Sequence, residues 1–98
     1  MNKQTLRALK GSIKKWELIV AGKGKDLGDE NCSLCKRFVY SRECMGCPVQ
    51  QKTGRQFCEA SPYKKWMLLT GGYGAVADTP ERKKAARAEL KFLKSLLP

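Results

Sequence analysis

Histidine is missing from this chain of 98 residues, and that single absence removes several classes of enzyme. Serine and cysteine nucleophiles usually rely on a histidine base, and catalytic zinc sites usually contain histidine ligands. Ser-His and Cys-His hydrolases and the usual catalytic zinc sites are therefore excluded. We expect a protein that is not an enzyme, and we assign no catalytic residue.

Acidic residues are scarce. The chain has 9 Asp and Glu against 20 Lys and Arg, which gives a formal net charge of +11. Such an excess favours a polyanionic partner, nucleic acid first, because basic side chains release the counterions condensed on it. Surplus lysine that serves solubility alone is the alternative explanation.

Long apolar runs are also missing. No run approaches the ~18 residues that suggest a membrane-spanning helix, and the N-terminus lacks the pattern of an export signal. We therefore expect no membrane partner and a reducing, cytoplasmic setting. The odd number of cysteines, 5, agrees with a reducing compartment.

The cysteines are concentrated in the middle of the chain. Cys32 and Cys35 form one Cys-x-x-Cys pair, Cys44 and Cys47 form a second, and Cys58 follows. A two-residue gap lets two sulfurs turn into one loop, and structural zinc prefers four such ligands in a closed tetrahedron. The sequence therefore predicts Zn²⁺ bound by the two pairs, with Cys58 either a buried core residue or a substitute ligand.

Two other uses of the cysteines remain as alternatives. Four thiolates can hold an iron–sulfur cluster, and Cys47-Pro48 resembles the ending of bacterial cluster motifs, although the rest of that spacing is missing. A disulfide framework is the other alternative. It is disfavoured because two close Cys-x-x-Cys pairs are poor long-range cross-links.

Apolar spacing and capping residues predict three helices, over residues 1–22, 61–70 and 79–97. Leu6, Leu9, Ile13, Trp16 and Val20 recur at steps of three and four, so they form one helical stripe. Helix-start signals precede the other two, in Ser61-Pro62-Tyr63 and Thr79-Pro80. An apolar face is expected on the last helix from Ala86, Leu90, Leu93 and Leu97.

The predicted fold is a small, α-rich, metal-stabilised domain with minor β content. Three helices surround a knuckle over 32–58, which holds the two Cys-x-x-Cys pairs and short hairpins. Residues 1–98 form a single domain, since a chain this short has no room for two cores. The apolar stripes are covered by helix packing within the chain or across a homodimer.

Charged residues outside the apolar stripes form two groups, one acidic and one basic. Asp26, Asp29 and Glu30 offer too few oxygen ligands for calcium, so we expect a solvated turn there. A basic outer face on the first helix is expected from Lys3, Arg7, Lys10, Lys14 and Lys15.

Basic residues also surround the cysteines. They could contact phosphates, soften the charge of a four-thiolate zinc centre, or form a solvated face. The candidate nucleic-acid-binding residues are Lys36, Arg37, Arg42, Lys52, Arg55, Lys10, Lys14 and Arg87. Tyr63 and Trp66 could stack on bases, but at helical spacing we expect both in the core.

The order of these motifs resembles that of small cysteine-rich proteins of tailed phages and prophages, which have a double Cys-x-x-Cys and are similar to zinc fingers. It implies a bacterial host cytoplasm and a bound metal, but no mechanism, because that group has no assigned activity. The resemblance covers most of the chain and is carried by Ala8, Ser12-Ile13, Trp16-Glu17, Asn31-Cys32-x-Leu34-Cys35-x-x-Phe38, Cys44-x-Gly46-Cys47-Pro48-Val49, Thr53-Gly54, Cys58, Ser61-Pro62-Tyr63 and Glu89-Leu90-x-Phe92-Leu93.

Three functions compete on these observations. The leading hypothesis is a non-enzymatic structural-zinc module, encoded by a phage, that binds nucleic acid or a nucleic-acid-handling protein. The alternative is an adaptor or inhibitor that acts on the acidic surface of a host protein without contacting nucleic acid. An iron–sulfur protein is the second alternative.

Overall fold

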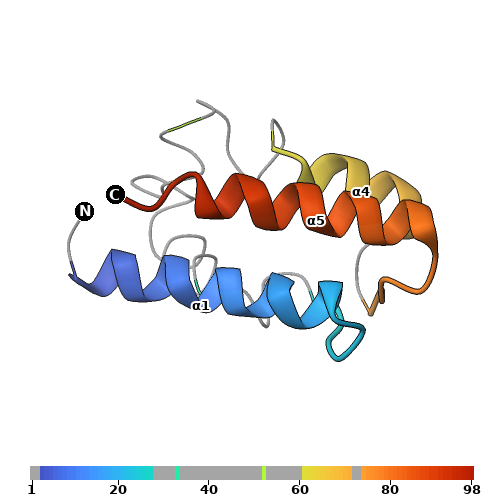
Figure 1. Ribbon diagram of the computed structural model, residues 1–98, viewed down its shortest axis with the longest axis horizontal. Helices are drawn as coiled ribbons and strands as arrows, with labels where there is room; N and C mark the ends of the chain where they lie inside the picture. The colour runs from blue at the N-terminus through green and yellow to red at the C-terminus, as the bar shows by residue number, and fades with distance from the viewer. Residues whose placement is uncertain (1–2, 28–32, 34–51, 53–60, 72–73) are drawn as a thin grey trace.

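The chain folds around three helices in the computed structural model, which describes residues 3–27, 33, 52, 61–71 and 74–98. These are α1 (Lys3–Val20), α4 (Tyr63–Thr70) and α5 (Pro80–Lys94). Figure 1 shows α1 and α5 side by side in opposite directions, with α4 beside the first half of α5. Over the residues that the structure describes, the prediction of a small, mostly helical protein with three helices is confirmed.

Helix α1 is amphipathic and ends at a glycine. Leu9, Ile13 and Trp16 are buried, as the apolar spacing predicted. The helix stops because Gly22 adopts a left-handed conformation, with φ of 77°. The N–H of Lys23 then donates to the carbonyl of Leu18 at 2.9 Å and that of Gly22 to Ile19 at 3.0 Å, the hydrogen-bond pattern of a Schellman cap.

Helix α4 is short and buries one large side chain. The Ser61 hydroxyl accepts from the N–H of Tyr63 at 3.3 Å at its start. The helix ends at Gly71, whose φ is 80° and whose N–H donates to the carbonyl of Met67 at 2.8 Å. Trp66 is the one buried residue of the helix, with no exposed surface.

Helix α5 begins at the predicted cap and ends before the predicted terminus. The Thr79 hydroxyl accepts from the N–H of Arg82 at 3.1 Å, and Pro80 follows at the first helical position. The helix ends at Lys94. Leu97 therefore lies beyond it and is 39% exposed, so the prediction that it extends the apolar face is wrong.

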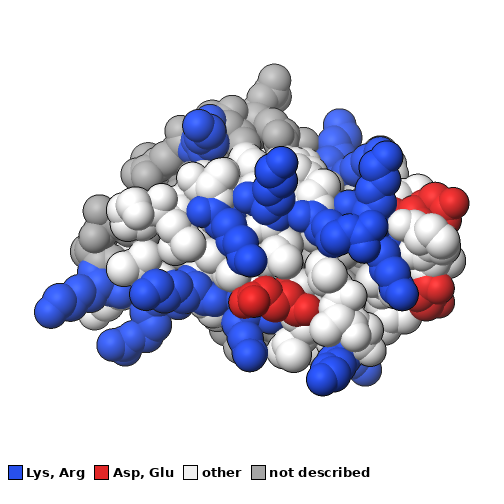
Figure 2. Space-filling view, viewed as in Figure 1, with Lys and Arg blue, Asp and Glu red and all other residues white. Residues whose placement is uncertain are grey.

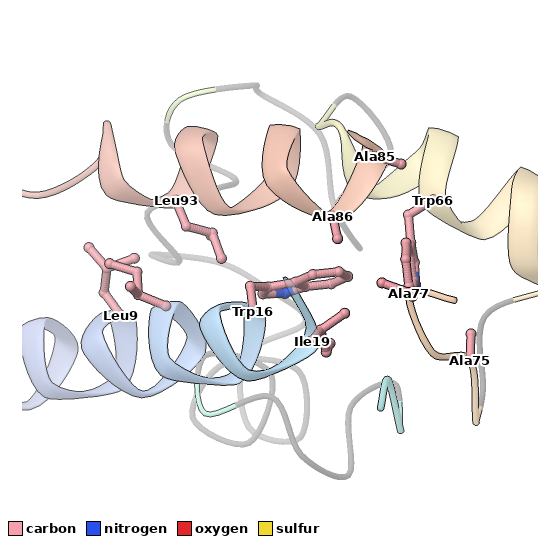
Figure 3. Close-up of a cluster of buried hydrophobic side chains, with 10 residues drawn as sticks. Leu9, Trp16, Ile19, Trp66, Ala75, Ala77, Ala85, Ala86 and Leu93 are labelled. Carbon is pink, nitrogen blue, oxygen red and sulfur yellow. The ribbon is translucent and has the colours of Figure 1, made fainter. Parts of the chain in front are cut away.

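The core lies between α1 and α5 and is closed at one end by α4. In Figure 3, Leu9, Trp16 and Ile19 of α1 lie opposite Ala86 and Leu93 of α5, while the α4 tryptophan approaches from the side. The Trp16 ring meets the Trp66 ring edge to face, with centroids 5.2 Å apart. The prediction that Trp66 belongs to the core is confirmed, and Tyr63 is packed against the same cluster.

The predicted knuckle lies almost wholly outside the described residues. All of the cysteines and both predicted hairpins fall there, so they stay predictions. The described part of the chain has no strand, only an isolated antiparallel bridge between Asp26 and Ala75. Ser33 belongs to the described residues and lies against α1. Its side chain is so close to Gly11 that a Cβ at that position would collide with it.

Candidate nucleic-acid interface

The outer side of α1 carries a stripe of cations. Lys3, Arg7, Lys10 and Lys14 are all exposed and follow one another at steps of four, three and four residues. Residues at these steps lie on one side of a helix, and here that side is opposite the buried stripe. At 1.5 Å per residue the cationic stripe extends over ~17 Å.

Helix α5 carries a second stripe of the same kind. Lys84, Arg87, Lys91 and Lys94 are exposed and recur at steps of three, four and three. They lie opposite the side that faces the core through Ala86 and Leu93. This stripe extends over ~15 Å.

The two stripes lie on the outer sides of α1 and α5, away from the core between these helices. Figure 2 shows basic side chains over both α1 and α5 on the face turned to the viewer, with few acidic ones between them. Surface cations this close to one another repel, and in this view acidic side chains are fewer than basic ones. We refer to the two stripes together, one on α1 and one on α5, as the basic face.

The structure places some of the predicted nucleic-acid-binding residues on the basic face. Lys10 and Lys14 are exposed on α1, and Arg87 is exposed on α5. Lys52 is exposed as well, but on neither helix. Outside the described residues lie Lys36, Arg37, Arg42 and Arg55.

The predicted metal ligands all lie outside the described residues, so the structure does not test whether they come together. These are Cys32, Cys35, Cys44, Cys47 and Cys58. Within the part that is described, no group of three or more His, Cys, Asp or Glu residues could hold a metal ion. The zinc site and the iron–sulfur alternative therefore stay predictions.

A buried carboxylate, not foreseen in the sequence, joins the basic helix to the rest of the fold. Asp26 has no exposed surface. Its Oδ1 accepts from the Nζ of Lys15 at 2.9 Å, and its Oδ2 accepts from the hydroxyl of Tyr63 at 2.8 Å and from Nε1 of Trp66 at 3.0 Å. Both carboxylate oxygens are thus satisfied by donors from α1 and α4, which is what a buried charge requires.

The backbone of the same residue holds the chain that leads to α5. The N–H of Asp26 donates to the carbonyl of Ala75 at 2.8 Å, and the N–H of Gly74 donates back to the carbonyl of Asp26. Gly74 has φ of 80°, a conformation that glycine adopts at little cost. One residue therefore ties α1, α4 and the approach to α5 together, and we call this arrangement the Asp26 hub.

Two expectations are corrected by the hub. Asp26 is not part of a solvated turn, because tertiary donors replace water around its carboxylate. Lys15 is not on the basic outer face, because its side chain is only 6% exposed and lies in an ion pair. The signal available in the sequence was weak: a buried Tyr or Trp needs an acceptor for its polar tip, but nothing in the sequence says which carboxylate supplies it.

The hub has the geometry of a structural element. A catalytic carboxylate must reach substrate, whereas both oxygens of Asp26 are occupied and the residue is inaccessible to solvent. Its charge is balanced inside the protein by Lys15.

Comparisons with known proteins identify no related protein. No family model matches the chain, and neither does any curated protein or solved structure. The resemblance to small phage proteins therefore stays a prediction. Among the described helices, none is both long enough and apolar enough to cross a membrane.

Proposed function

We propose that this chain is a non-enzymatic module that binds nucleic acid by contacting phosphates with its basic face. The observation that carries the proposal is the pair of exposed cationic stripes on α1 and α5, formed by segments far apart in the sequence. Duplex DNA presents about one negative charge per 1.7 Å of its axis. A stripe of ~15 Å therefore faces roughly nine phosphate charges.

This mode of binding has little sequence preference. Lysine and arginine that contact phosphates fix orientation but do not read bases. Within the described part of the chain, the two tryptophans, Trp16 and Trp66, are in the core and do not face an external base. We therefore expect a Kd of about 10⁻⁶ to 10⁻⁴ M at physiological salt, the range of non-specific binding.

The cysteine pairs complete the proposal. We propose that Cys32, Cys35, Cys44 and Cys47 hold a structural Zn²⁺, with Cys58 as core residue or substitute ligand. The support is their spacing and the need of a chain this short for a stabilising element. Elemental analysis of protein purified without added metal tests it: one zinc per chain is expected, and iron with visible absorption would replace this part of the proposal by an iron–sulfur cluster.

Titration of a fluorescein-labelled duplex at several salt concentrations tests the nucleic-acid part. Each neutralised phosphate contributes about −0.9 to the slope of log K against log salt. The variants Lys10→Gln and Arg87→Gln each remove one cation, from α1 and α5 respectively, and each is expected to reduce the magnitude of the slope by about 1.

Lys64→Gln is the matched control, since it removes one exposed cation from α4 and none from either stripe. Its slope is expected to equal that of the unmodified protein. Absence of binding at low salt would refute the proposal. Equal effects of all three substitutions would show a diffuse attraction by net charge and no contribution particular to the basic face.

A further inference from the structure

Helix α4 exposes apolar side chains that the core does not use. Met67 is 45% exposed, Leu68 79% and Leu69 41%. Single exposed apolar residues are ordinary on protein surfaces, but adjoining ones mark a binding site more often than chance. Together with Thr70, these three form the second turn of the helix before its cap at Gly71.

The geometry of α4 explains why these side chains face solvent. Successive residues of an α-helix are 100° apart. With Trp66 directed into the core, Leu68 lies 200° away on the opposite side of the helix, and Met67 and Leu69 flank it. Burial of Trp66 therefore places Leu68 on the outer side of the helix, while Met67 and Leu69 lie at the border between core and solvent and are less exposed.

Lysines border the apolar turn. Lys64 precedes Leu68 by four residues and Lys65 precedes Leu69 by four, so each lysine lies next to one of the leucines on the helix surface. Both lysines are exposed, and α4 contains no acidic residue. The surface formed by Lys64, Lys65, Met67, Leu68 and Leu69, which we call the α4 surface, is thus apolar at one end and cationic at the other.

The charge decides which occupant fits the α4 surface. An acidic partner gains from the two lysines while its apolar residues cover the leucines. A second copy of this chain would bring two more lysines and no α4 carboxylate, and each copy carries a net charge of +11. A nucleic acid would contact the lysines but would leave the aliphatic side chains against polar sugar and phosphate.

We propose that the α4 surface binds an acidic amphipathic helix of a partner protein, with aliphatic residues of that helix packed on Leu68 and carboxylates near Lys64 and Lys65. This is helix recognition through an apolar strip with charged borders. Methionine suits such a surface because its flexible thioether adapts to different shapes. The α4 surface is separate from the two stripes of the basic face, so the protein can hold nucleic acid and a partner at different sites.

Two synthetic peptides test the proposal with the full chain. Each has about 18 residues with leucines at helical spacing; one carries glutamate and the other lysine at the flanking positions. The glutamate peptide is expected to bind at least about tenfold more tightly, as measured by fluorescence anisotropy. Methyl NMR is expected to show the signals of Met67 and Leu68 shifting on binding.

Substitutions on the protein locate the binding site. Leu68→Ser is expected to weaken binding of the glutamate peptide about tenfold or more, because it removes the most exposed aliphatic side chain. Leu18→Ser is the matched control: Leu18 is 38% exposed on α1, and its substitution is expected to leave the peptide Kd within about twofold. Both side chains face solvent, and circular dichroism confirms that each variant folds.

Several outcomes would overturn the proposal. Equal binding of the two peptides, or an unchanged Kd for Leu68→Ser, would remove the acidic helix as occupant. A dimer that Leu68→Ser converts into a monomer in sedimentation would assign the surface to a second copy. Loss of duplex affinity in Leu68→Ser would assign it to nucleic acid. None of these results changes the salt slopes of Lys10→Gln and Arg87→Gln, so the proposed function is tested separately.

Discussion

Lys14 and Lys15 are neighbours in the sequence but lie in opposite environments, one in solvent and one in the protein interior. Lys14 is exposed on the basic face, whereas Lys15 is buried and pairs with Asp26 at 2.9 Å. A charge in water is solvated and interacts only weakly with other charges of the protein, whereas a buried charge has lost that solvation and depends on its protein partners. The basic face and the Asp26 hub therefore use the same residue types for different ends: the first for association, the second for holding the fold together.

The largest expected effect comes from removing the hub carboxylate. In Asp26→Ala the buried ammonium of Lys15 loses its carboxylate partner. The hydroxyl of Tyr63 and the Nε1–H of Trp66 lose their hydrogen-bond acceptor. We expect a loss of about 3–5 kcal/mol in the free energy of unfolding, measured by urea denaturation. Asp78→Ala is the control, because its ion pair with Arg82 is exposed, and it is expected to cost less than about 1 kcal/mol. Similar losses for the two variants would contradict the contrast between buried and exposed charge.

The neighbouring lysines give the most direct comparison. Lys15→Met is expected to cost about 3 kcal/mol, since the carboxylate keeps two neutral donors but loses its cation. Lys14→Met is expected to stay within about 0.5 kcal/mol of the unmodified protein. The double variant Lys15→Met/Asp26→Leu sharpens the comparison, because replacing both charges by apolar groups is expected to cost less than either single change in the pair. If the costs of the two single changes simply added in the double variant, the coupling energy between Lys15 and Asp26 would be zero, which would contradict the contrast.

A smaller effect is expected from one aromatic donor of the hub. Tyr63→Phe keeps the ring that meets Trp16 edge to face at 5.8 Å but removes the hydroxyl that donates to Asp26. Hydrogen bonds to charged groups contribute about 1.5–3 kcal/mol, and we expect the lower end because Lys15 and Trp66 still bind the carboxylate. Thermal unfolding measures the loss. No change in the melting temperature would indicate that water replaces the hydroxyl.

The smallest expected effect concerns the side of α1 near Ser33. Alanine normally stabilises a helix interior by about 1 kcal/mol relative to glycine. In Gly11→Ala that gain is expected to disappear, because the new Cβ collides with the Ser33 side chain. The double variant Gly11→Ala/Ser33→Gly removes the side chain that the new Cβ would meet. The difference between its change in the free energy of unfolding and the sum of the two single changes measures the contact. Full stabilisation by Gly11→Ala alone would show that Ser33 moves away without cost.

Local patterns predicted the helices and most of the core. The spacing of Leu9, Ile13 and Trp16 marked the buried side of α1, and Thr79-Pro80 marked the start of α5, because both signals depend on residues within a few positions of one another. The C-terminal limit of α5 was wrong, since apolar residues such as Leu97 continue past the last helical turn.

The Asp26 hub could not be predicted because its contacts are not local. Asp26 meets its partners across 11, 37 and 40 positions of sequence. Three carboxylates stood in the same predicted turn, and only the packing of α1 on α4 selects which of them meets buried donors. The basic face was partly predictable, since its exposed cations follow helical spacing. Lys15 was not, because it is buried although the preceding residue, Lys14, is exposed.

The hub also makes the two ends of the cysteine-containing segment meet. The hydroxyl of Tyr63 donates to Asp26 across 37 positions of sequence, so the segment between these two residues begins and ends at the same contact. The entropy of closing such a segment changes only slowly with its length, by roughly 0.6 kcal/mol for each doubling. An insertion that doubled the length of this segment is therefore expected to cost only about that much in closure entropy, provided that the contacts of Asp26 are kept.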